Sequence, residues 1–161
     1  MSSPGLAEIL RILARHRVDF IVVGGMAAAL QGAPVPTLDL DIVYSRDPGN
    51  VTRLLAALSA MEATFRADPR GLSPGESHLR SAGHKLLVTP HGALDVLGAI
   101  EESTGYEDLL PDATLLEVAG ERTRVLSLER LIRVKEKLSR PKDRAMLPVL
   151  RTTLEEKRRR G

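Results

Sequence analysis

Apolar residues recur along the chain with changing periods, and these changes divide it into segments. Residues 6–13 place apolar side chains at helical spacing, which predicts an amphipathic helix ending near residue 16. An apolar strand is expected at 19–23. The Gly24-Gly25 pair breaks that strand, and the small residues at 26–30 then favour a short buried helix.

The middle of the chain begins with prolines that keep the backbone extended before the next strand. Pro34 and Pro36 disfavour helix, and a strand is predicted at residues 38–44. Asp47 is a suitable N-cap, with Pro48 as the first residue of an amphipathic helix. This order of strand, turn, helix, loop and strand indicates mixed α and β structure.

The following region combines an irregular stretch with two hairpins. Residues 68–83 are rich in Gly, Pro and Ser without a clear period, and we interpret them as a loop that could border an active site. Strands are predicted at 85–89 and 93–97, and again at 115–118 and 123–126. Each pair is close enough in sequence to form a hairpin.

The last third is predicted to be helical. Ser127 caps one helix, and a break at 139–141 precedes a final helix that Pro148 is expected to kink. We therefore predict an α+β fold, a small mixed β-sheet with helices packed on it, in a single domain over residues 1–161. Its core spans about 5–126 and its C-terminal helices about 127–158.

Composition narrows the function classes. Of the 161 residues, 43% are hydrophobic and 27% charged, which is ordinary for one soluble domain. The chain contains no Cys, which excludes disulfides and thiolate metal sites, and its few aromatic residues disfavour a protein that stacks nucleic-acid bases. No segment resembles an export signal or a membrane span, so we expect a cytoplasmic protein with no membrane partner.

The charge pattern is uneven although the net charge is only +2. Basic residues gather in the last third and end in Lys157-Arg158-Arg159-Arg160. A solvated helix face and tail explains this run, while binding to phosphate or RNA is the alternative. Binding to RNA through this run would weaken steeply with salt.

Three aspartates form the most unusual polar pattern. Asp39 and Asp41 are two positions apart on the predicted strand, so their side chains should share one face. A register exists in which Asp95 of a neighbouring strand joins them. Two such charges about 4 Å apart repel by about 4 kcal/mol at an effective dielectric of 20. Protonation, an inserted Arg or Lys, or a divalent cation such as Mg²⁺ or Mn²⁺ would offset this repulsion.

The glycine turn adds a second signal. Gly24 and Gly25 follow a strand and open a helix, where backbone N–H groups can face an anion. Such turns also serve packing alone, and neither the dinucleotide-binding nor the P-loop pattern is present. Together with the aspartates, the turn favours a nucleotide phosphate as the anion.

These residues resemble the nucleotidyltransferase superfamily of DNA polymerase beta. The matching stretch reads Val22-Val23-Gly24-Gly25-Met26-Ala27, then Gly32, then Pro36-Thr37-Leu38-Asp39-Leu40-Asp41, with Asp95 as the third acid. The resemblance implies that NMP is moved from an NTP to an acceptor. It also implies that Asp39, Asp41 and Asp95 hold Mg²⁺ and that Gly24, Gly25 and Thr37 contact the nucleotide.

The details are similar to a subgroup of small bacterial nucleotidyltransferases that includes abortive-infection toxins. That subgroup tends to have a lysine-bearing helix before an Arg-Pro-Lys-Asp stretch, and this chain has Lys135 and then Arg140-Pro141-Lys142-Asp143. Lys135 falls on the apolar stripe of its helix, where it needs a partner. It could reach the helix edge, or it could neutralise nucleotide phosphates or the acidic site.

Two functions therefore lead. The first is an Mg²⁺-dependent nucleotidyltransferase acting on RNA, a protein or a small molecule, with Asp95 helping to deprotonate the acceptor. The second is a weakly active or inactive binding protein of the same fold, such as a toxin–antitoxin component with a helical partner protein. Met26 stands where many members have the serine that contacts phosphate, which favours the second. The four histidines match no zinc pattern, and only His84 is a candidate for substrate contact.

Overall fold

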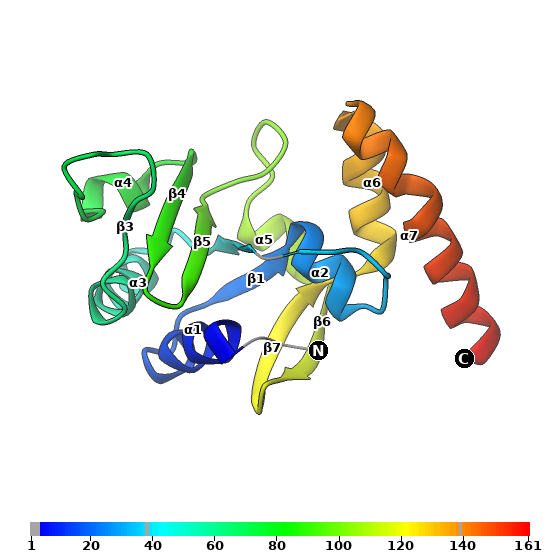
Figure 1. Cartoon of the computed structure of the whole chain (residues 1–161), viewed down its shortest axis with the longest axis horizontal. Helices are drawn as coiled ribbons and strands as arrows, with labels where there is room; N and C mark the ends of the chain where they lie inside the picture. The colour runs from blue at the N-terminus through cyan, green and yellow to red at the C-terminus, as the bar shows by residue number, and fades with distance from the viewer. Residues whose placement is uncertain (1–3, 38, 139) are drawn as a thin grey trace.

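The computed structural model describes residues 4–37, 39–138 and 140–161, which form a mixed sheet with helices on it (Figure 1). The strands are β1 (Phe20–Val23), β2 (Leu40–Tyr44), β3 (Thr64–Phe65), β4 (His84–Thr89), β5 (Gly92–Leu97), β6 (Ala113–Val118) and β7 (Glu121–Leu126). The helices are α1 (Pro4–Arg15), α2 (Gly24–Leu30), α3 (Pro48–Ala60), α4 (Glu76–Arg80), α5 (Tyr106–Leu109), the 3₁₀ turn η1 (Leu110–Asp112), α6 (Leu128–Leu138) and α7 (Pro141–Arg160). The predicted α+β fold is confirmed.

The sheet brings together strands that are distant in sequence. Its seven strands lie in the order β3-β4-β5-β2-β1-β7-β6 within the described residues. β2 pairs with β1 antiparallel and with β5 parallel, so the acidic strand has a neighbour on each side. Both predicted hairpins form, as β4–β5 and β6–β7.

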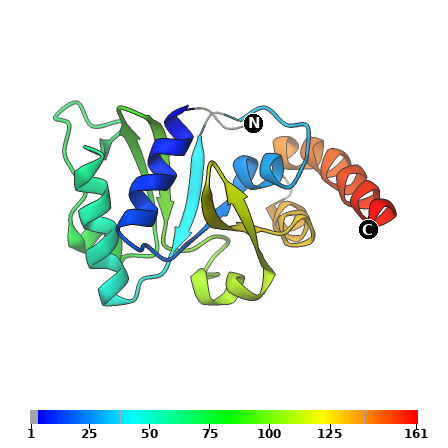
Figure 2. The same ribbon diagram turned by 90° about the horizontal axis from the view of Figure 1, so that it is seen from below.

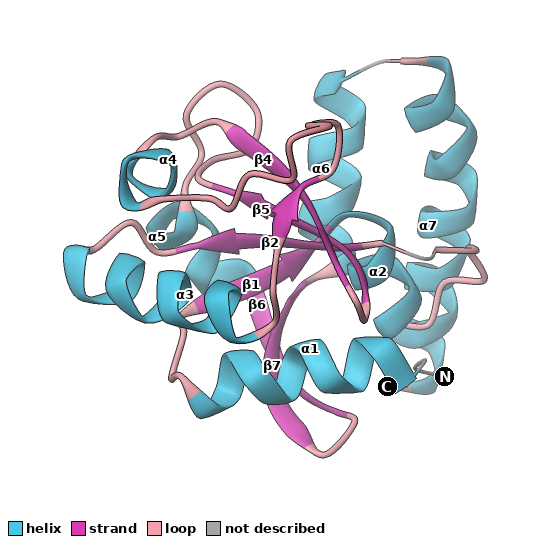
Figure 3. Cartoon of the chain, turned by 60° about the vertical axis from the view of Figure 1, so that its left-hand side comes forward, coloured by secondary structure: helices cyan, strands magenta, loops and turns pink. Residues whose placement is uncertain are grey.

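The helices divide between the ends and one face of this sheet. α1 and α3 lie side by side across one face, where they cover buried side chains such as Val22 and Ile42, which are directly opposite each other in the β1–β2 pairing (Figures 2 and 3). α6 and α7 pack against each other at the end of the molecule opposite α3 and α4 (Figure 1). The strands β4 and β5 therefore keep an open face.

The two predicted N-cap residues behave differently. Ser127 caps α6 as predicted, because its Oγ accepts a hydrogen bond of 3.2 Å from the Arg130 N–H. Asp47 occupies the N-cap position of α3, but its side chain forms no capping hydrogen bond, which corrects the predicted role. α7 continues through Pro148. The predicted break at 139–141 includes Ser139, which lies outside the described residues.

β2 begins at Leu40, later than the predicted residue 38. Asp39 precedes the strand and is exposed, so the expectation that Asp39 and Asp41 alternate along one strand is wrong. A local hydrogen bond of 3.3 Å, from the Thr37 hydroxyl to the Asp39 carbonyl, competes with strand pairing here. Leu38, also expected in the strand, lies outside the described residues.

The stretch interpreted as a loop at 68–83 contains α4, and β3 precedes it. Leu79 anchors α4 because it is completely buried. Lys85 fixes the end of the stretch, since its ammonium group donates hydrogen bonds to the Ser81 and Gly83 carbonyls and to the Tyr44 hydroxyl. Burial lowers the pKa of Lys85 to about 8. These contacts join segments far apart in sequence, which a periodicity argument does not detect.

In the described residues, no helix combines the length and apolar character needed to cross a membrane.

Candidate active site

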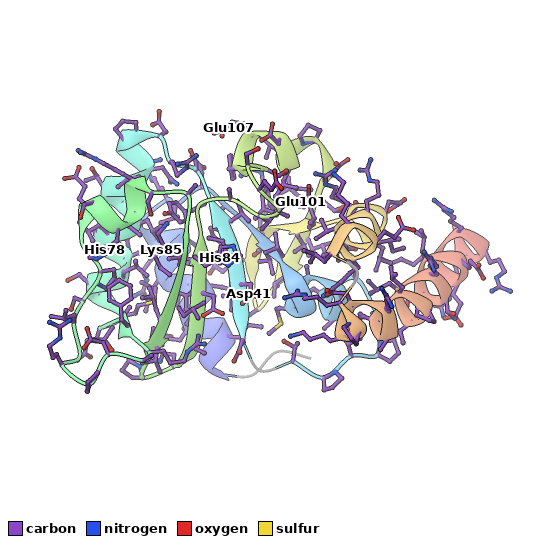
Figure 4. The ribbon with its side chains drawn as sticks, turned by 90° about the horizontal axis from the view of Figure 1, so that it is seen from above. Asp41, His78, His84, Lys85, Glu101 and Glu107 are labelled. Carbon is purple, nitrogen blue, oxygen red and sulfur yellow. The ribbon has the colours of Figure 1, made fainter. Side chains whose placement is uncertain are left out.

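Two of the predicted aspartates meet at the centre of the sheet. The parallel pairing of β2 and β5 places Asp41 directly opposite Asp95, and the pairing of β1 with β2 places Val23 on the other side of Asp41. Directly opposed residues point to the same face of a sheet. The register in which Asp95 joins Asp41, which the sequence allowed, is therefore the one that forms. Figure 4 shows Asp41 on β2, at the end of the sheet away from Glu101 and Glu107.

Asp41 lacks a full set of partners. Its Oδ1 is buried and has no hydrogen-bond partner within the described structure. Burial, followed by the negative charge of Asp95 and a side-chain hydrogen bond with it, raises the pKa of Asp41 to about 7, with a smaller contribution from Asp39 and an opposing one from Arg66. A buried carboxylate oxygen without a donor is costly, so this position favours a proton or a cation.

The glycine turn lies directly against Asp41. Gly24 has φ +67, and a Cβ placed on it would be 2.7 Å from Asp41 Oδ2. Both the left-handed backbone and the close approach require glycine. A Cβ on the next residue, Gly25, would be 3.4 Å from the Thr37 Oγ1. The structure thus brings Gly24, Gly25 and Thr37 to the acidic site.

Asp95 has a partner that the sequence did not reveal. Arg66, which follows β3, forms an ion pair with Asp95 through Nη2, and the same nitrogen donates a 3.0 Å hydrogen bond to the Leu87 carbonyl. An inserted arginine was one of the three ways expected to offset the repulsion between the aspartates, but the sequence did not indicate which arginine it would be. The preceding strand, β3, has only two residues and shows no periodicity that would have pointed to Arg66.

The oxygen donors of the site fit one divalent cation better than two. Asp41 offers a buried oxygen without a partner, Asp39 is exposed nearby, and such oxygens suit Mg²⁺ or Mn²⁺. Asp95 is already engaged by Arg66. Across the parts of the chain that the structure describes, no group of three His, Cys, Asp or Glu side chains is arranged to hold a metal ion.

Lys135 has its partner elsewhere. Its ammonium group lies 2.9 Å from Asp143 Oδ1 of α7, and its side chain is 18% exposed. Asp143 is fully buried and also pairs with Arg140, whose hydrogen bond is the main cause that lowers the pKa of Asp143 to about 2. The ion pair supplies the partner that an inward lysine needs. Contact between Lys135 and a nucleotide stays a prediction.

The open face beside Asp95 is partly apolar. His84, Leu86 and Val88 alternate along β4 and are exposed, with Leu86 48% and Val88 39% accessible. Leu86 lies directly opposite Asp95 in the β4–β5 pairing. A shallow hollow of about 510 Å³ adjoins them, lined by Phe65, Ala67, Asp68, Pro69, Arg70, His84 and Leu86. Figure 4 labels His84 on this strand.

Comparison with known proteins identifies relatives in structure alone. No protein-family model matches the chain. No curated protein matches its sequence. A suspected nucleotidyltransferase from Thermotoga maritima is 22% identical at a TM-score of 0.58, and the match covers 94% of this chain and 91% of that one.

Two other solved structures are similar over most of the chain. The lincosamide antibiotic adenylyltransferase LnuA, solved with lincomycin bound, is 11% identical at a TM-score of 0.65, with 95% of this chain and 98% of that chain covered. ANT(2")-Ia, solved in complex with adenylyl-2"-tobramycin, is 16% identical at a TM-score of 0.57, with 92% and 87% covered. The chain therefore has the nucleotidyltransferase fold.

Proposed function

We propose that this protein is a nucleotidyltransferase that uses Mg²⁺ or Mn²⁺ to move an NMP from an NTP to an acceptor hydroxyl. The observation that carries the proposal is the pairing of Asp41 with Asp95 on adjacent parallel strands, with a buried oxygen of Asp41 left without a partner. The glycine turn that touches Asp41 and the fold of the structural neighbours support it.

Each residue has a role in this proposal. Asp39 and Asp41 hold the metal, which when bound neutralises phosphate charge and makes the acceptor hydroxyl more acidic. Gly24, Gly25 and Thr37 contact the nucleotide phosphates. The acceptor oxygen forms a bond to the α-phosphorus, the bond to the pyrophosphate oxygen breaks, and Asp95 receives the hydroxyl proton.

The open face of β4 suggests the character of the acceptor. Leu86 and Val88 offer exposed apolar surface next to Asp95, and the adjacent hollow carries His84 and Arg70. A small molecule with hydroxyl groups and an apolar part fits this surface. The structural neighbours support this proposal, since the LnuA structure holds lincomycin and the ANT(2")-Ia structure holds adenylyl-2"-tobramycin. RNA and protein are the other acceptor classes, and few aromatic side chains are present to stack RNA bases.

A thermal-shift screen tests the nucleotide proposal without knowledge of the acceptor. Each of the four NTPs is added with Mg²⁺, and with EDTA as the control, because a ligand that binds the folded chain raises its melting temperature. We expect a shift that needs both NTP and metal and that Asp41→Asn abolishes. The absence of a shift with every pair would overturn the proposal.

A second candidate is a binding protein that keeps the fold without turnover, such as a toxin–antitoxin component with a helical partner. The ion pair between Arg66 and Asp95 favours it, since it occupies the carboxylate assigned to the acceptor proton. Transfer of label from an α-labelled NTP to any acceptor would exclude this alternative. Metal-dependent nucleotide binding without transfer, over a broad acceptor panel, would favour it.

A further inference from the structure

One row of residues crosses the sheet at the level of the candidate site. Arg66 N–H donates a 2.9 Å hydrogen bond to the Leu86 carbonyl, which extends the pairing of β3 with β4 by one residue. Leu86 is opposite Asp95, and Asp95 is opposite Asp41. Strand pairing therefore fixes the backbone of Arg66 in the row of residues that contains Asp95, with β4 between them.

The guanidinium group of Arg66 is held by two partners. Nη2 contacts Asp95 Oδ1 and also donates to the Leu87 carbonyl. The Arg66 side chain is 36% exposed and that of Asp95 only 14% exposed, so the pair is partly removed from water. By comparison, Arg70 in the same segment pairs with Asp68 while 74% exposed. An ion pair shielded from water is screened less than an exposed one.

The two facing carboxylates are consequently unequal. The charge of Asp95 is neutralised by the guanidinium group of Arg66, which contacts Oδ1, whereas Asp41 Oδ1 is buried without a hydrogen-bond donor. A divalent ion bound to Asp95 would have to share that carboxylate with a fixed positive charge. Asp41 forms no ion pair among the described residues, although the charge of Arg66 also acts on it, so an ion bound to Asp41 and Asp39 does not have to share a carboxylate that is already ion-paired.

We propose that Arg66 takes the place of one divalent cation, so that the site holds a single metal ion, at Asp39 and Asp41. Arg66 supplies the second positive charge of the site and positions Asp95. This inference rests on the proposed function, because it assigns the charges of the same site.

Counting bound ions tests the assignment. Mn²⁺ alone is titrated into the full chain, and free Mn²⁺ is followed by electron paramagnetic resonance. The variants are Arg66→Gln, which removes the charge, Arg66→Lys, which keeps it, and the double variant Arg66→Gln/Asp95→Asn. Arg70→Gln is the matched control, as it removes an arginine from the same segment, and thermal melts show which variants are folded.

We expect one Mn²⁺ per chain for the wild type, Arg66→Lys and Arg70→Gln, two for Arg66→Gln, and one again for the double variant. Two ions on the wild type, or one on folded Arg66→Gln, would overturn the role of Arg66 and leave the proposed function standing. If Arg66→Gln does not fold, two ions on Arg66→Lys or on the wild type would still overturn it. If no variant binds Mn²⁺ and no NTP shifts the melting temperature, the proposed function falls as well.

Discussion

At the scale of single residues, Asp41 connects the stability of the protein with its chemistry. A carboxyl group whose pKa is raised on folding stabilises the folded chain only while it is protonated. The raised pKa of Asp41, about 7, therefore means that its contribution is fully present below about pH 4 and is lost as the pH rises through 7. The free energy of unfolding should fall over this interval when no metal is present.

Asp41→Asn should remove this pH dependence. In EDTA at pH 8 we expect the variant to be more stable than the wild type by about 1 kcal/mol, a value reduced to allow for partial exposure of the carboxylate. At pH 4 the two should be equal, because both side chains are neutral. Urea denaturation at the two pH values measures the difference. Asp47→Asn, at an exposed position, is the control and should change stability at neither pH.

Gly24 allows a second test at residue scale. Gly24→Ala adds a Cβ 2.7 Å from Asp41 Oδ2 and also requires a left-handed backbone, which costs about 1–2 kcal/mol in an alanine. Gly71→Ala is the matched control, since Gly71 has φ +64 with nothing within 4 Å of the added atom. Both variants should lose stability, but only Gly24→Ala should also lose the metal-dependent NTP shift. Equal losses of that shift would show that the contact with Asp41 is unimportant.

At the scale of elements, α6 and α7 are joined by a buried charge cluster. Asp143 of α7 forms ion pairs with Lys135 and Arg140. Its lowered pKa means that it stabilises the fold above about pH 4 and loses this contribution as the pH falls toward 2. The cluster explains why a lysine can lie on the apolar stripe of α6.

Asp143→Asn should cost about 2 kcal/mol at pH 7, because hydrogen bonds to a charged group are lost and Lys135 keeps no carboxylate there. The cost should shrink as the pH approaches 2. Urea denaturation across this interval measures it. Glu136→Gln is the matched control, because Glu136 pairs with Arg151 between the same two helices but at the surface, where about 0.5 kcal/mol or less is expected. A larger loss for Glu136→Gln would contradict the assignment.

The elements that sequence predicted are those with a local signal. α1, the two hairpins and the cap of α6 follow from periodicity, turn residues and Ser127. β3 and α4 were not predicted, because Phe65, Leu79 and Lys85 act through partners distant in sequence. In the candidate site, the facing of Asp41 and Asp95 could be anticipated from the side-chain alternation, whereas Arg66 could not.

At the scale of the whole molecule, ligand binding should be confined to one part of the sheet. Addition of ATP with Mn²⁺ should slow hydrogen exchange of the backbone amides at 24–26 and 39–41, around Asp41. The edge strand β6 should not respond, because three strands, β2, β1 and β7, separate it from Asp95. Mass spectrometry of peptides locates the change. Protection centred on α6 and α7 would instead assign the nucleotide to Lys135 and contradict the site at Asp41.

The seven-stranded sheet also has a consequence for how the protein reaches its native state. Val22 pairs with Val125, and Asp41 pairs with Asp95, so the central strands meet only after long stretches of chain have closed into loops. Such non-local contacts slow folding. The carboxylates cannot face one another in a nascent chain that ends before residue 95. The ion pair between Arg66 and Asp95, and with it the full arrangement of charges in the candidate site, should therefore form only after β5 has joined the sheet.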